Sequence, residues 1–62
     1  MKNNIANIRK QKGLTQMELA ELVGVNRFHI SKIERGKRSP SVKLLVKIAN
    51  VLGVPIDDLL MS

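Results

Sequence analysis

Helix stop signals divide this chain of 62 residues into short pieces. Four stretches with the apolar spacing of helices each end beside a glycine, and these glycines are Gly13, Gly24, Gly36 and Gly53. A glycine favours the end of a helix because it readily adopts the left-handed backbone conformation found there. No stretch shows the two-residue alternation of a strand. We therefore predict an all-α fold, a compact bundle of short helices.

Start signals complete this pattern and give five predicted helices, which span 3–11, 16–22, 27–35, 42–52 and 55–61. Residues that commonly cap helices precede the second, third and fourth segments, and these are Thr15, Asn26 and Ser41. Glu18 completes a capping box with Thr15. Pro55 suits the start of the fifth helix, where Asp57 and Asp58 would meet the positive end of the helix dipole.

The balance of charge indicates a polyanionic partner. The chain has 11 Lys and Arg residues against 5 Asp and Glu residues. The basic residues are concentrated between Arg27 and Arg38, where Glu34 is the one acid, whereas the last segment carries two aspartates and no base. Nucleic acid and an anionic membrane surface both fit this excess, and an inert basic surface is the simplest alternative.

Composition argues against several other classes of protein. The length allows one domain, which we take as residues 1–62. Without cysteine there is no disulfide or thiolate metal site, and the single histidine, His29, cannot build a zinc site alone, so we expect no metal and no cofactor. Asp57 and Asp58 are adjacent and diverge on a helix, which speaks against an enzyme. No signal peptide or membrane span is apparent, and we expect a cytoplasmic protein.

The predicted helix 27–35 has two contrasting sides. Ile30 and Ile33 share one side of the helical wheel, which we expect to face the core, and Glu34 leans toward it. The opposite side carries an aromatic ring, two long cations and a hydroxyl, from Phe28, Lys32, Arg35 and Ser31. A solvated face seldom carries the one aromatic residue of a chain, although core packing of Phe28 remains an alternative. Arg27 and His29 flank this outward side.

The segment "GVN", residues 24–26, joins two short helices through a tight turn. Two short helices joined in this way form the helix-turn-helix motif, whose second helix enters the major groove of DNA. We therefore predict a helix-turn-helix over residues 16–35 and double-stranded DNA as the partner.

The order of the segments "GLTQ", "ELA", "VGV", "ISKIERG" and "P-S" resembles the helix-turn-helix domain of the Cro and phage-repressor type, the Xre family. The resemblance covers about residues 5–60. It implies a lambda-repressor-like bundle of five helices that binds operator DNA as a two-fold dimer, most often as a repressor, in a prokaryotic or phage context.

The resemblance also implies roles for individual residues. The base-reading positions are Arg27, Phe28 and Lys32. Positions at or near the DNA backbone are Gln16, Asn26, Ser31, Arg35, Lys37 and Arg38, and Gln16 also supports the third helix. Arg9 and Glu34 match a partly buried ion pair between the first and third helices. A solvated basic loop is the alternative for Arg35, Lys37 and Arg38, and His29 is either a phosphate contact or a half-exposed flank residue.

The C-terminal part, 44–61, departs from the family pattern through its apolar residues. We expect more apolar side chains than a small core can bury, and these are Leu44, Val51, Ile56, Leu60 and Met61. Exposed apolar residues on one side indicate an interface, here a homodimer through the last two helices. The alternative is that Leu44 and Met61 are scattered surface residues.

Two further functions remain open at this stage. The chain could be an antitoxin-like protein-interaction module, whose protein partner binds the apolar last helices and whose DNA binding is autoregulatory. A basic peptide on a membrane surface is the third reading, and the capped helices of a packed bundle argue against it.

Overall fold

The computed structural model describes residues 3–60, and every regular element in that range is a helix. The five elements are α1 (Ile5–Gln11), α2 (Gln16–Val23), α3 (Arg27–Glu34), α4 (Val42–Leu52) and α5 (Ile56–Leu60). The all-α prediction is confirmed, and each predicted helix exists within two residues of its expected bounds. Met61, which we assigned to the fifth helix, lies outside the described residues.

The first helix begins two residues later than expected because of its asparagines. The Asn3 side-chain oxygen accepts a hydrogen bond from the Ile5 amide at 3.1 Å, and its amide nitrogen donates to the Ile33 carbonyl at 2.7 Å. The Asn4 amide donates to the Leu59 carbonyl at 2.9 Å. These bonds hold the chain before α1 in a non-helical path against the ends of α3 and α5.

The predicted caps are confirmed. Thr15 and Glu18 form a complete capping box at the start of α2. The side-chain oxygen of Asn26 accepts from the His29 amide at 2.8 Å, and that of Ser41 accepts from the Leu44 amide at 3.1 Å. Each such bond satisfies a backbone donor that a helix start leaves without a partner.

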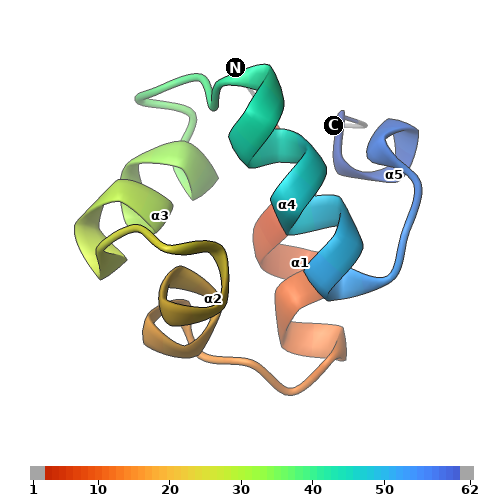
Figure 1. Ribbon diagram of the computed structural model, residues 1–62, viewed down its shortest axis with the longest axis horizontal. Coiled ribbons are helices and arrows are strands. Elements are labelled where there is room, and N and C mark those ends of the chain that lie inside the picture. Colours follow the sequence, from red (N-terminus) through yellow and green to blue (C-terminus); the bar gives the residue numbers. More distant parts are fainter. Residues whose placement is uncertain (1–2, 61–62) are drawn as a thin grey trace.

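The core receives apolar side chains from all five helices. α2 packs against α3 and α4, while α5 packs against α1 and α4. In Figure 1, α4 lies in the centre of the view, with α2 and α3 on one side and α5 on the other. The side chains that are almost fully buried are Ile5, Leu19, Ile30, Ile33, Ile48, Leu52 and Leu59. No helix within residues 3–60 has both the length and the apolar character needed to span a membrane.

The expectation that Leu44 is exposed is wrong. Its side chain is 8% exposed and belongs to the core. Leu44 lies one turn before Ile48 and two turns before Leu52, on the face of α4 that packs inward. Val51 and Ile56 are half-buried and pack against the same core, so the bundle accommodates more apolar surface than its length suggested.

Candidate nucleic-acid interface

The turn between α2 and α3 sets the direction of α3. Gly24 has a φ of +80°, which closes the end of α2, and its amide donates to the Ala20 carbonyl at 2.9 Å. The Val25 amide donates to the same carbonyl at 3.0 Å, and the Val25 side chain packs against the core. Asn26 then caps α3. The turn therefore joins the two helices of a helix-turn-helix, as predicted for residues 16–35.

A buried ion pair ties α1 to α3. The Arg9 Nε donates to Glu34 Oε2 at 2.6 Å and its second terminal nitrogen to Glu34 Oε1 at 3.2 Å. The first terminal nitrogen donates to the Leu14 carbonyl at 2.7 Å. The two charged side chains are 8% and 5% exposed. Both carboxylate oxygens of Glu34 and three guanidinium nitrogens of Arg9 are used, so the pair holds the inner side of α3 against α1. The ion pair between these two helices that the resemblance implied is therefore present.

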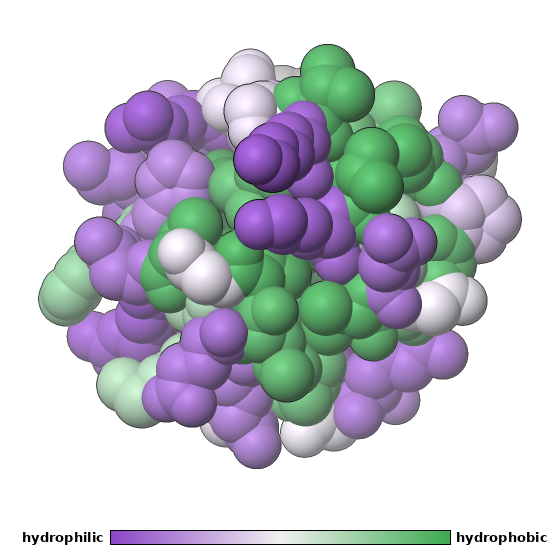
Figure 2. Space-filling view, viewed as in Figure 1, coloured by the Kyte–Doolittle hydropathy of each residue, from purple (hydrophilic) through white to green (hydrophobic). Residues whose placement is uncertain are grey.

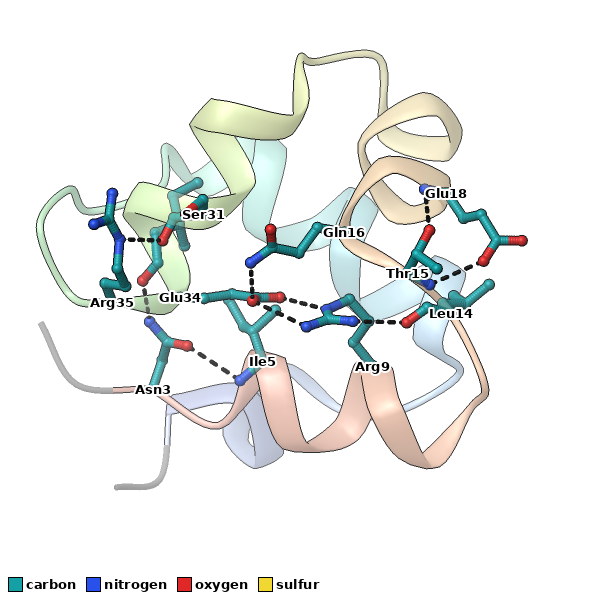
Figure 3. A network of polar contacts seen from close by, with 11 residues as sticks. Asn3, Ile5, Arg9, Leu14, Thr15, Gln16, Glu18, Ser31, Glu34 and Arg35 are labelled. Carbon is teal, nitrogen blue, oxygen red and sulfur yellow. Dashed lines mark hydrogen bonds and ion pairs between the residues drawn. The ribbon is translucent and has the colours of Figure 1, made fainter.

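Gln16 extends this network to the start of α2. Its side-chain nitrogen donates to Glu34 Oε1 at 2.9 Å, so one carboxylate receives bonds from both α1 and α2. Figure 3 shows Gln16 and Arg9 converging on Glu34. The supporting role that the resemblance implied for Gln16 is therefore present in the structure.

The outward side of α3 carries the predicted base-reading residues. Ile30 and Ile33 are buried, whereas Arg27 and Lys32 are exposed and the Phe28 side chain is 65% exposed. The alternative that Phe28 packs in the core is therefore wrong. The Arg27 guanidinium carbon lies 4.9 Å from the centre of the Phe28 ring, within the range of a cation–π contact.

The residues expected near the DNA backbone surround this side. Arg35, Lys37 and Arg38 are exposed at the end of α3 and in the following loop, and Ser31 is half-buried. The Lys37 amide donates to the Lys32 carbonyl at 2.9 Å, a bond that closes the end of α3 before the loop. Asn26 is exposed, but its side-chain oxygen is occupied by the cap.

Sequence reasoning missed two lysines next to α3. Lys43 and Lys47, one turn apart on α4, line a shallow hollow of about 280 Å³ together with His29 and Ser41. No acidic residue lines it, so it adds positive charge beside the outward side of α3. The i, i+4 spacing of these lysines was a signal that could have indicated this flank.

Large apolar side chains are exposed on α2, α3, α4 and α5. In Figure 2, hydrophilic surface predominates on the side of α3, whereas hydrophobic surface, crossed by hydrophilic side chains in the middle of the view, extends over α4 and toward α5. Exposed apolar side chains on these last helices include Val42 at 78%, Val46 at 39% and Leu60 at 43%. Val42 and Val46 were also missed by sequence reasoning, although they lie one turn apart on one side of α4.

Comparison with known proteins identifies the family. The family described as helix-turn-helix matches residues 5–59. An uncharacterized HTH-type transcriptional regulator from Methanocaldococcus jannaschii is 48% identical over 59 residues, which are 95% of this chain and 89% of that protein. This chain belongs to the helix-turn-helix family.

Solved structures also match most of the chain. The P22 c2 repressor protein, in complex with a synthetic operator, has a TM-score of 0.87 and 32% identity over 92% of this chain and 86% of that chain. A complex of SinR and SinI gives a TM-score of 0.79 and 41% identity over 86% of this chain and 52% of that chain. The lambda-repressor-like fold implied by the resemblance is thereby confirmed.

Proposed function

We propose that this helix-turn-helix protein is a sequence-specific transcriptional regulator that places α3 in the major groove of DNA. The observation that carries the proposal is the outward side of α3, where Arg27, Phe28 and Lys32 stand exposed on a helix held by its buried side. Arg pairs with guanine, Lys does so less rigidly, and an apolar ring packs on the methyl group of thymine.

The surrounding residues supply contacts to the DNA backbone. Arg35, Lys37 and Arg38 offer charge to phosphates, which raises affinity without selecting a sequence. Gln16, Asn26 and Ser31 complete this set. Gln16 stands at the start of α2, where the free amides of a helix start favour an anion, and its bond to Glu34 couples that contact to the position of α3.

The regulator acts as a homodimer in this proposal. The interface comprises exposed or half-buried apolar residues of α4 and α5 within the region 44–61, namely Val51, Ile56 and Leu60. Leu44 is not part of it, because its side chain is buried, and Met61 lies outside the described residues. A two-fold dimer would present two α3 helices to half-sites about 34 Å apart.

The remaining parts of the proposal follow from the family and from the composition of the chain. We propose repression rather than activation, because the P22 protein named above is a repressor. We further propose that residues 1–62 act as one DNA-binding domain, that the protein is cytoplasmic, and that it works without a cofactor or catalysis.

A protein-interaction module is the second candidate function. It is supported by the SinR–SinI complex among the matching structures and by the exposed apolar side chains of α4 and α5. A stable complex with the product of a neighbouring gene would favour it. Recovery of homodimers alone in pull-downs from the source cells would count against it.

The decisive experiment selects binding sites from a random pool of DNA duplexes. The enriched duplex and a scrambled one are then titrated over a salt series with wild type, Arg27→Ala and Lys37→Ala. We expect a two-fold symmetric site. Arg27→Ala should cost about 1–3 kcal/mol and relax the preference at one base, whereas Lys37→Ala should weaken both duplexes alike and lower the salt slope by about one.

One result would contradict sequence-specific DNA binding. If no sequence is enriched and both duplexes bind equally, the basic side is a non-specific electrostatic surface, and the protein-interaction function becomes the leading candidate.

A further inference from the structure

Arg27 and Phe28 form one unit on the surface of α3. The guanidinium carbon of Arg27 lies 4.9 Å from the centre of the Phe28 ring. Phe28 is 65% exposed and is the one aromatic residue of the chain, so the contact is a surface feature and not a consequence of core packing. A cation above one ring face leaves the ring edge and the opposite face open to a partner.

The two groups offer different chemistry to a base edge. A guanidinium presents a rigid fork of donors that matches the O6 and N7 acceptors of guanine. An open phenyl ring offers apolar contact to the C5-methyl group of thymine. Stacked bases along a strand are separated by about 3.4 Å. Because the guanidinium lies against the ring, both groups reach the same short stretch of a groove, which favours neighbouring base pairs over distant ones.

We propose that Arg27 and Phe28 together read a guanine and a thymine in neighbouring base pairs as one two-base element. This inference rests on the proposed function, because it requires α3 to lie in the major groove. The ring restricts the guanidinium before DNA arrives, which lowers the entropy lost on binding. Recognition of the guanine and of the thymine methyl should therefore be coupled.

The test changes single atoms of the enriched duplex. Deoxyuridine in place of thymine removes only the methyl group, and 7-deazaguanine in place of guanine removes the N7 acceptor. For wild type we expect one thymine whose replacement weakens binding about 3- to 5-fold. We expect a guanine in a neighbouring base pair whose replacement weakens binding about 5-fold or more.

Variants of the ring separate its two roles. Phe28→Ala should bind the thymine and deoxyuridine duplexes equally, and its penalty for 7-deazaguanine should shrink about 2- to 5-fold, because Arg27 loses its cation–π partner. Phe28→Leu should keep sensitivity to the methyl group while losing the same part of the guanine penalty. Lys10→Ala, at an exposed lysine of α1 outside the proposed interface, is the control and should keep both sensitivities. Circular dichroism melts check that each variant folds. Because Phe28 is exposed, we expect its substitution to leave the fold intact.

Four results would overturn the inference: no thymine methyl matters to wild type, the methyl effect persists in Phe28→Ala, the 7-deazaguanine penalty is unchanged in Phe28→Ala, or the sensitive guanine and thymine are not neighbours. Each of these leaves the selected site and the proposed function intact. Failure of the proposed function is distinguishable, since no sequence would then be enriched at all.

Discussion

At the scale of single residues, Glu34 is the point where three parts of the molecule meet. Its carboxylate accepts hydrogen bonds from Arg9 of α1 and from Gln16 of α2, while the residue itself belongs to α3. The pair is buried, so its charges depend on each other and not on water. The same residues that stabilise the bundle therefore also hold the helix that we expect to read DNA.

Removal of the Glu34 charge should destabilise the fold strongly. We expect Glu34→Gln to lower the free energy of unfolding by about 3 kcal/mol, because it leaves the buried Arg9 guanidinium without a counter-charge. Urea unfolding followed by circular dichroism measures this. The double variant Arg9→Met with Glu34→Leu should recover much of the loss, and a double variant less stable than the single one would contradict the explanation.

At the scale of elements, the position of α3 relative to α2 depends on how α2 ends and how α3 begins. Gly24 takes a positive φ of 80°, and a Cβ added there would have no heavy atom within 4 Å. The requirement at this position is therefore one of backbone conformation and not of space. Asn26, two residues later, supplies the cap that starts α3.

Substitution of Gly24 tests the backbone requirement. We expect Gly24→Ala to cost about 1–2 kcal/mol, since an L-residue is disfavoured in the left-handed region. That corresponds to a fall in Tm of roughly 4–16 °C for a domain of this size. Gly24→Asn should cost less, because asparagine tolerates this conformation better. Equal melting temperatures for both variants and wild type would show that the turn adopts another conformation.

Substitution of Asn26 tests the cap. Asn26→Ala should cost about 1 kcal/mol, because the His29 amide loses its acceptor, while Asn26→Ser should cost much less. Thermal unfolding of the three proteins provides the comparison. Indistinguishable curves for alanine and serine would remove the cap from the account of α3.

At the scale of the whole molecule, exposed bases gather around α3, while exposed apolar side chains lie on α5 and, beside Lys43 and Lys47, on α4. The chain carries a net charge of +6, and the exposed bases of α3 and its following loop contrast with the exposed apolar side chains Val42, Val46 and Leu60. In the proposed function, the polyanion would bind at α3 and the second copy of the chain at α4 and α5.

The proposed homodimer can be tested at Leu60. Leu60→Lys should shift the monomer–dimer equilibrium toward monomer, because a two-fold interface contains the substituted residue twice. Sedimentation equilibrium of the variant and wild type measures the shift. Leu22→Lys is a matched control, as Leu22 is an exposed leucine of α2 outside the proposed interface. An equilibrium unchanged by Leu60→Lys would remove α5 from the interface.

Local signals in the sequence were sufficient for the helices, the caps and the direction of Phe28. Glycine stops, cap residues and the wheel of α3 act within a few residues of one another, so they can be recognised without the fold. The Arg9–Glu34 pair was also anticipated, although from the family resemblance and not from spacing. Only the tertiary structure decided the burial of Leu44, the exposure of Val42 and Val46, and the contact of Gln16 with Glu34. The spacing of Leu44, Ile48 and Leu52 places them on one side of α4. Which side packs against α2 and α5, and which groups far apart in the chain meet, depends on the tertiary fold.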